Sequence, residues 1–376
     1  MLVTITTERY NMSSSQSAGD DSDIVQPTTK QTTYHGHFDC FSGAAGDMLL
    51  SSCLDASENS TELAKHVSEC ISRGMPELAG EFEIQTKRVW RGGMGSIAGL
   101  HVTVLSKYNN EPAPVPKRKS DDDDDHHHHH QQHHSHQHDH QYSSHQHDVG
   151  DHDHSHDHAH DHNSHSHDHS SSTTKGPLRN LREIKRLIEH SSDEFIDPWV
   201  KTIAILTFTE LAHAEATTHG AESIESVHFH EVGAIDSIVD TVGTLIALHY
   251  LNVTSFSCSR LPIGEGTVWT DHGILPVPAP ATLRLLVGMP TCPGPLGVVT
   301  GELVTPTGAA LLRALTLKYP RGIDAKETST TTPTKNNYKG RPPNFTIRKI
   351  GIGAGTKDFE KHPNILRLLL GDDIVT

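Results

Sequence analysis

Residues 227–240 have the sequence VHFHEVGAIDSIVD, in which a short extended segment gives way to a helix. His228 and His230 are two residues apart, so both imidazoles leave the same face of an extended chain. From Ile238 to Leu251 the apolar residues recur with a helical period, which indicates a helix that starts close to Asp236. This segment therefore predicts a strand that leads directly into a helix.

The same segment carries side chains that suit a divalent cation. His228, His230, Glu231 and Asp236 can converge at the start of the predicted helix, and imidazole nitrogens and carboxylate oxygens are common metal ligands. Asp240 lies four residues after Asp236, on the same helix face. The alternative is that Asp236 only caps the helix, Asp240 is solvated and the histidines are hydrogen-bonded residues of a sheet.

A tract of histidine and aspartate extends from Asp121 to His169 and holds 21 of the 33 histidines of the chain. It has almost no apolar side chain to bury, so we expect it to be disordered. Near neutral pH most free imidazoles are unprotonated and can bind nickel, copper, zinc or cobalt, which predicts metal capture. The alternative is an insertion without function, because a longer surface loop costs little free energy.

Charge and composition exclude several classes of protein. The tract supplies twelve aspartates and no lysine or arginine, so it accounts for most of the formal net charge of −16, and the rest of the chain carries −4. No basic cluster is interleaved with aromatic residues, and no apolar run approaches the length of a membrane span. We therefore expect neither a nucleic-acid partner nor a membrane. Five cysteines without a C-x-x-C pair and a polar amino terminus favour a cytoplasmic protein.

The fold class predicted from these patterns is α+β, with helices packed on at least one mixed or antiparallel sheet. We expect five segments: a disordered tail at 1–33, an amino-terminal α+β subdomain at 34–106, a disordered His/Asp-rich metal-binding loop at 107–176, a main α+β domain at 177–371, and a tail at 372–376. Strands are predicted at 34–40, 82–90, 99–105, 253–259, 346–351 and 365–370, and helices at 61–73, 178–190, 198–218 and 281–286.

The segment FSGAAGDM, residues 41–48, is a glycine-bearing turn between a predicted strand and a helix. Backbone amides at such a helix start can receive a phosphate, for which the candidate residues are Ser42, Gly43 and Gly46. Asp39 and Asp47 flank the turn and could serve a cation. The turn lacks the lysine of a phosphate-binding loop, so a plain strand–turn–helix connection is the alternative.

Further candidates lie in the second half of the chain. His272 follows Asp271 in a proline-rich connection and could act as a ligand or as an acid–base group, or could be a solvated turn residue. Thr305 is a good helix N-cap, which places Thr307 and Gly308 in a first turn that can receive an anion. The glycines of 351–355 are expected between strands, where they do not support a dinucleotide fingerprint.

Seven motifs in this order resemble the LarC nickel-insertion proteins, and they are spread over nearly the whole of the range from Tyr34 to Gly371. They are DCFSGAAGDM (39–48), VHFHEVGAIDSIVD (227–240), LPIGEG (261–266), HGILPVPAPAT (272–282), GELVTPTGAALL (301–312), IGIGAGTKDF (350–359) and PNILRLLLG (363–371). The resemblance implies a CTP-dependent cyclometallase that inserts nickel into pyridinium-3,5-bisthiocarboxylic acid mononucleotide. Its product is the nickel-pincer nucleotide, which lactate racemase-type enzymes receive.

Relatives continue past the LRLLLG strand into a domain that binds CTP with manganese or magnesium, so we expect that site in a separate domain or chain. Because nickel must be held and then released, we expect His228, His230 and Glu231 to be transient nickel ligands, with Asp236 as an orienting group or a further ligand. The mononucleotide phosphate would lie at Ser42–Gly46 or at Thr307–Gly308. His272 and Asp39 are the candidate catalytic residues. The alternative functions are a nickel or zinc storage and delivery protein and, less well supported, a metal-dependent hydrolase.

Overall fold

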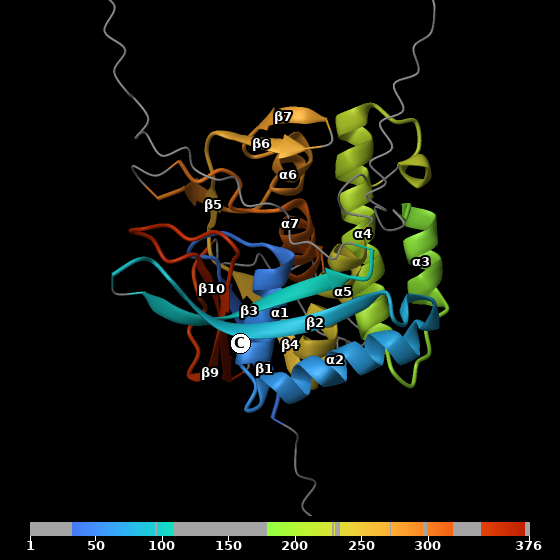
Figure 1. Cartoon of the computed structure of the whole chain (residues 1–376), viewed down its shortest axis with the longest axis horizontal. Helices are drawn as coiled ribbons and strands as arrows, with labels where there is room; N and C mark the ends of the chain where they lie inside the picture. Colours follow the sequence, from blue (N-terminus) through green and yellow to red (C-terminus); the bar gives the residue numbers. More distant parts are fainter. Residues whose placement is uncertain are drawn as a thin grey trace, which may run out of the picture.

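A six-stranded mixed sheet forms the frame of the protein (Figure 1). The computed structural model describes residues 32–94, 96–108, 179–227, 229, 234–270, 272–295, 299–318 and 340–372. The histidine tract and three of the expected metal ligands, His228, His230 and Glu231, lie outside these residues. Within them, helices and a mixed sheet occur together, which confirms the α+β class.

The sheet has the strand order β2-β3-β9-β10-β1-β4. Its strands are β1 (Tyr34–Asp39), β2 (Phe82–Arg91), β3 (Ile97–Ser106), β4 (Val253–Cys258), β9 (Ile347–Ala354) and β10 (Ile365–Asp372). β1 is antiparallel to β10 and parallel to β4, and β3 joins β9 in parallel through the pair Leu100 and Gly353. The sheet therefore combines strands from the amino-terminal segment with the last two strands described.

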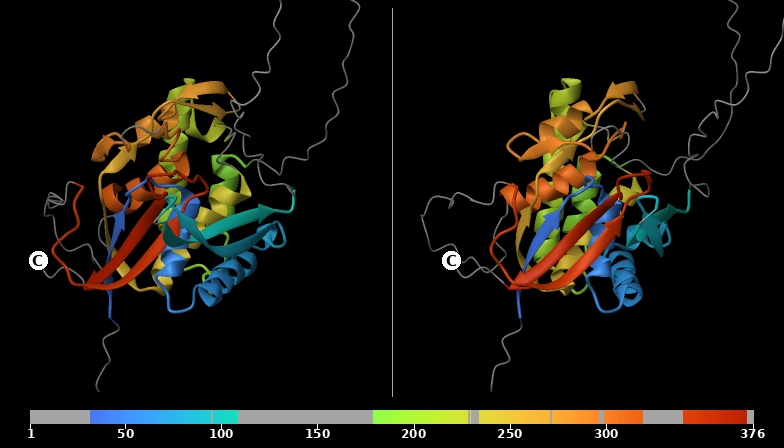
Figure 2. Two further views of the ribbon diagram at one scale, coloured as in Figure 1. Left: turned by 60° about the vertical axis from the view of Figure 1, so that its left-hand side comes forward. Right: turned by 90° about the vertical axis from the view of Figure 1, so that its left-hand side faces the viewer.

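Helices cover one face of this sheet, as the right-hand view of Figure 2 shows with β1, β9 and β10 in front. The helices are α1 (Gly46–Asp55), α2 (Ser60–Gly74), α3 (Leu181–Glu189), α4 (Pro198–His219), α5 (Ile235–Tyr250), α6 (Pro280–Leu285) and α7 (Pro306–Arg313), with short 3-10 helices at Pro76–Leu78 and Ile224–Ser226 and a π-helix at Ala314–Lys318. α1 packs on β3, β9 and β10, and α5 packs on α1. Their contact face is apolar and buried.

Local sequence explains where two of these helices begin. The side chain of Asp197 accepts a hydrogen bond of 2.8 Å from the backbone N–H of Trp199, and Pro198 occupies the first helical position of α4. Thr305 accepts in the same way from Gly308 N–H at 3.2 Å and starts α7. The cap at Thr305 and the helix of residues 198–218 were both predicted from the sequence. The helix of residues 235–250 is also confirmed, but Ala234 rather than Asp236 is its N-cap.

Two glycines let α1 approach β9. A Cβ added to Gly351 would lie 1.9 Å from the backbone oxygen of Ser52, and one added to Gly353 would lie 2.1 Å from that of Met48. These glycines therefore belong to strand β9, and the expectation that they lie between strands was wrong. The physical reason is close packing, because a helix backbone here lies directly on a strand backbone.

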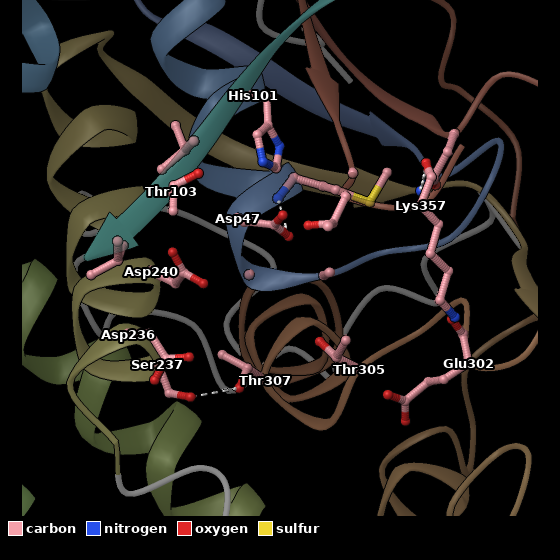
Figure 3. A pocket seen from close by; sticks show the side chains of 18 of the residues that line it. Asp47, His101, Thr103, Asp236, Ser237, Asp240, Glu302, Thr305, Thr307 and Lys357 are labelled. Atoms are coloured by element: carbon pink, nitrogen blue, oxygen red, sulfur yellow. Dashed lines mark hydrogen bonds between the residues drawn. The ribbon is translucent and has the colours of Figure 1, made fainter. Parts of the chain in front are cut away.

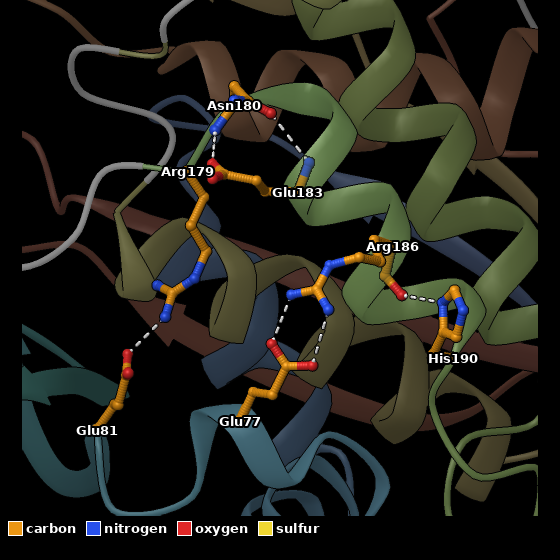
Figure 4. A network of polar contacts seen from close by, with 7 residues as sticks. All are labelled: Glu77, Glu81, Arg179, Asn180, Glu183, Arg186 and His190. Carbon is orange, nitrogen blue, oxygen red and sulfur yellow. Dashed lines mark hydrogen bonds and ion pairs between the residues drawn. The ribbon is translucent and has the colours of Figure 1, made fainter.

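Two ion pairs connect α3 to the segment that precedes β2 (Figure 4). Arg179 contacts Glu81 and Arg186 contacts Glu77, each with a nitrogen–oxygen distance of 2.7 Å. The Arg179–Glu81 pair is largely buried, whereas the Arg186–Glu77 pair is exposed and contributes little stability.

Two small sheets, β5–β8 (Leu261–Ile263 and Thr291–Pro293) and β6–β7 (Thr267–Thr270 and Gly273–Pro276), lie beside α6 and were not predicted. Their strands are only three or four residues long, so they carry too little periodicity to be recognised in the sequence. Among the described residues, no helix is long and apolar enough to cross a membrane.

Two buried histidines of β1 are hydrogen-bonded to β4. Ser257 Oγ lies 2.7 Å from His35 Nε2 and 2.8 Å from His37 Nδ1. Burial lowers the pKa of His37 to about 4, although the nearby Asp39 carboxylate acts in the opposite direction. His37 is therefore neutral at physiological pH.

Candidate functional site

Three helix N-termini meet at a cavity of about 460 Å³ (Figure 3). The first turns of α1, α5 and α7 form much of its wall, together with residues 101–104 of β3, residues 355–357 after β9, and Glu302, Leu303 and Asn364. Free backbone N–H groups and the macrodipole give a helix N-terminus a partial positive charge. The cavity can therefore accept anionic groups, whether they belong to the protein or to a ligand.

Three carboxylates occupy one end of this cavity. Asp47 comes from the first turn of α1, and Asp236 and Asp240 come from successive turns of α5. Figure 3 shows the Asp47 and Asp240 side chains facing the same space, with Asp236 next to Asp240 along the helix. Gly46 makes this approach possible, because a Cβ at that position would lie 2.5 Å from Asp240 Oδ2.

Burial and mutual repulsion shape the protonation of these acids. Burial raises the pKa of Asp47 to about 6, while the nearby His101 lowers it and Asp236 raises it. Burial, followed by the charges of Asp47 and Asp236, raises the pKa of Asp240 well above its ordinary value. Burial also raises the pKa of Asp236. The surrounding protein therefore compensates the ionised forms of these acids poorly.

The other end of the cavity is suited to an anion. Thr305 and Thr307 bring the first turn of α7 to the wall, and Thr307 Oγ1 donates to Ser237 Oγ at 3.3 Å. Lys357 also lines the cavity, and its Nζ donates to the backbone oxygens of Thr300 at 3.1 Å and Glu302 at 2.6 Å. Burial lowers the pKa of Lys357, which the charge of Glu302 opposes.

Several residues expected from the sequence lie at this cavity. Gly46, Asp236 and Thr307 line it. Gly308 is not part of the cavity wall and packs behind it, where an added Cβ would lie 2.3 Å from the backbone oxygen of Ala44. Its role visible in the structure is therefore the close contact between α7 and the turn before α1.

Ser42 and Gly43 lie beside the cavity and are not part of its wall. Ser42 is buried, and its Oγ donates to the backbone oxygen of Pro363 at 2.5 Å and lies 2.8 Å from His362 Nε2. Gly43 has a φ of 123°, and a Cβ there would lie 2.0 Å from the Leu303 backbone oxygen. Both residues hold the turn against its neighbours.

The two expected catalytic residues are also away from the cavity wall. Asp39 forms an ion pair with Arg367 on the neighbouring strand β10. His272 is exposed at the turn between β6 and β7, where its ring centroid lies 4.6 Å from that of His219. In the part of the chain that the structure describes, no three His, Cys, Asp or Glu side chains already stand at metal-ligand spacing.

Three of the residues that line the cavity were not proposed from the sequence: His101, Lys357 and Asn364. His101 Nδ1 lies 2.8 Å from the backbone oxygen of Ala354, and the Asn364 amide donates to the backbone oxygen of Lys357 at 2.9 Å. Lys357 brings a cationic group to this wall. Its position opposite the α7 N-terminus depends on the return of β10 along β9.

An α+β frame with clustered carboxylates at one end of a cavity and cationic donors at the other defines a protein that can handle a metal cation together with an anionic ligand. Comparison with known proteins agrees with this description. The chain belongs to the nickel insertion protein family, whose model matches residues 37–375.

Bacterial relatives have names that describe nickel insertion. The chain is 45% identical over 196 residues to a protein of Geobacter sp. (strain M21), an alignment that covers 52% of this chain and 44% of that protein. It is 40% identical over 195 residues to one from Myxococcus xanthus, covering 52% and 43%. The alignments thus span less than half the length of these curated relatives. No solved structure matches the chain.

Proposed function

We propose that this protein inserts nickel into pyridinium-3,5-bisthiocarboxylic acid mononucleotide, and that the cavity at the α1, α5 and α7 N-termini is the place of reaction. The observation that supports this proposal is the division of the cavity into a carboxylate end and an anion-receptive end. A mononucleotide needs a cationic site for its phosphate, and nickel needs a negative one. Membership of the nickel insertion family makes nickel the cation to consider.

The anion-receptive end would hold the substrate. The phosphate would lie against the first turn of α7 and near Lys357, whose Nζ already faces backbone oxygens at this end. This contact fixes the mononucleotide at its non-reacting group, so that the pyridinium ring points toward the carboxylates.

The carboxylate end would favour the chemical step. Nickel forms bonds to two sulfurs and to one ring carbon, and the ring carbon gives its bonding electron pair to nickel as its proton leaves. Negative charge from Asp236 and its neighbours stabilises both the approaching Ni²⁺ and the departing proton. We propose that His228, His230 and Glu231 deliver the ion to Asp236 as transient ligands, because imidazole suits nickel and releases it more readily than thiolate does.

The supply and use of the product extend beyond this cavity. The histidine tract would keep nickel at a high local concentration. CTP with manganese or magnesium would be bound in a separate domain or chain, and a racemase-type enzyme would receive the cofactor. Because all the described cysteines are free, a reducing compartment such as the cytoplasm is the proposed location.

The test is a turnover assay. The protein is incubated with the mononucleotide, NiCl₂, CTP and MnCl₂, with and without a carboxy-terminal CTP-binding domain from a relative, and product is followed by absorbance and mass. We expect product in the supplemented reaction and its loss in Lys357→Met, with Lys361→Met as a matched control on the same loop outside the cavity wall. Nickel binding without product under every condition would instead support a storage and delivery protein.

A further inference from the structure

We propose that Asp47 and Asp240 bind a hard divalent cation of the magnesium or manganese type, distinct from the nickel that would reach the neighbouring Asp236. The proposal depends on the geometry of the cavity and does not require the proposed function. It assigns a resident ion to the carboxylate end, next to the site for an anion.

The first observation is the absence of a cationic partner within the protein. Among the residues that the structure describes, no lysine or arginine forms an ion pair with Asp47, Asp236 or Asp240. The imidazole of His101 acts on Asp47 by lowering its pKa, but it forms no ion pair with it among the described residues. Three acids that face one cavity without a lysine or arginine partner either take up protons or are compensated by a bound ion.

The second observation is an oxygen without a hydrogen bond. Asp240 Oδ1 is buried and has no hydrogen-bond partner among the described residues. The Thr244 hydroxyl lies nearby but donates to the backbone oxygen of Asp240, at 2.6 Å. A buried carboxylate oxygen that only completes a core normally accepts at least one hydrogen bond. The Asp240 side chain faces the same space as the Asp47 carboxylate, and both residues line the cavity.

The third observation is the glycine opposite Asp240. A Cβ at Gly46 would lie 2.5 Å from Asp240 Oδ2 and 2.8 Å from Asp240 Cβ. Gly46 is the first residue of α1 and has no positive φ that would require glycine. The small residue therefore serves to make room for the carboxylate in this position.

The donor set selects the class of ion. Carboxylates and water suit magnesium and manganese, whereas nickel, zinc and copper favour imidazole. Magnesium keeps several water ligands and is commonly held by one or two carboxylates together with a substrate phosphate. A site of this kind needs no preassembled group of three ligands, in agreement with the separation of these acids in the described structure. The α7 N-terminus and Lys357 place a phosphate on the other side of the cavity, where it can share the ion.

The experiment measures Mn²⁺ bound to the full chain by electron paramagnetic resonance, without mononucleotide or nickel. We expect Asp47→Asn and Asp240→Asn to lose one Mn²⁺ ion or to bind it at least about tenfold more weakly. Glu62→Gln, an exposed acid in the first turn of α2, is the control and should retain the ion. The aspartates of the histidine tract are present in every variant, so they contribute equally. Circular dichroism checks that the variants are folded.

Competition tests the class of ion. Excess Mg²⁺ should displace the Mn²⁺ that depends on Asp240. The proposal is overturned if wild type and both asparagine variants bind the same number of Mn²⁺ ions with the same affinity. It is also overturned if Ni²⁺ at equimolar concentration displaces this Mn²⁺ while Mg²⁺ does not, because the site would then be that of nickel.

A variant that does not fold is replaced by Gly46→Ala, in which the displaced Asp240 should lower Mn²⁺ affinity in the same way. Since no nickel insertion is measured, failure of the proposed function would leave these outcomes unchanged.

Discussion

Replacing Asp47 with asparagine should make the protein less sensitive to pH when no divalent cation is present. The native pKa of Asp47 is about 6, against 3.8 as the ordinary value. Between these values the native state binds a proton that the unfolded state lacks, so the free energy of unfolding falls as pH rises through this window. At about 1.4 kcal/mol for each pKa unit, the loss above pH 7 is about 3 kcal/mol. Asparagine cannot ionise and does not carry this loss.

Urea unfolding in the presence of a chelator measures the effect. From pH 4 to pH 7.5 the stability of Asp47→Asn relative to wild type should rise by about 2.4 kcal/mol, since pH 4 already lies slightly above the ordinary pKa. His37 has the opposite dependence, since its lowered pKa makes the native state lose stability as pH falls from 6.5 toward 4, but it is the same in both proteins. Asparagine can keep the hydrogen bond of 2.8 Å from Met48 N–H. A difference between the two proteins that stays constant with pH would refute the reasoning.

Three further predictions concern the metal and the packing. Deleting Asp121–His169 should remove most of the capacity for divalent metals, which equilibrium dialysis measures, while the melting temperature stays the same; a deletion variant that keeps full metal stoichiometry would contradict the expected role of the tract. Changing His228 and His230 together to alanine should abolish nickel transfer but leave bulk nickel binding intact, with Asp236→Asn milder, and a normal transfer rate in the double variant would show that these histidines are not ligands. Gly353→Ala should destabilise the protein by about 1–3 kcal/mol or more, because the new Cβ would lie 2.1 Å from the Met48 backbone oxygen; a change below about 0.5 kcal/mol in urea unfolding would count against the close packing of α1 on β9.

The helices were predictable because their signals are local. Asp197 and Pro198 start α4, and Thr305 and Pro306 start α7. Two neighbouring residues are therefore enough to place each N-terminus. The apolar period after Asp236 fixes α5 in the same way. By contrast, the assignment of Gly351 and Gly353 to a strand depends on a helix that lies far away in the sequence.

The candidate site could be predicted only in part, for a related reason. Asp236 and Thr307 were recognised because each belongs to a helix start that the sequence shows. The opposition of Asp47 and Asp240 depends on how α1 crosses α5, and the arrival of Lys357 depends on the pairing of β9 with β10. Such juxtapositions are tertiary, and no spacing within one segment encodes them. Asp39 and Ser42 belong to a local motif that suggested a site, but their side chains do not line the cavity. Ser42 bonds to the backbone oxygen of Pro363, and Asp39 pairs with Arg367.

The pairing of β1 with β10 has a consequence for biosynthesis. Tyr34 pairs with Asp372, so the first and last strands that the structure describes are direct neighbours in the sheet. While the chain emerges from the ribosome, β1 and α1 are synthesised long before β9 and β10, the strands that they contact in the folded protein. Contacts between segments so far apart in the sequence also form slowly. The wall formed by Asp47 and Lys357 is therefore completed only after β9 and β10 have been synthesised. The histidine tract that we propose as a nickel store precedes both strands in the chain, so it is made before the cavity that would receive its metal.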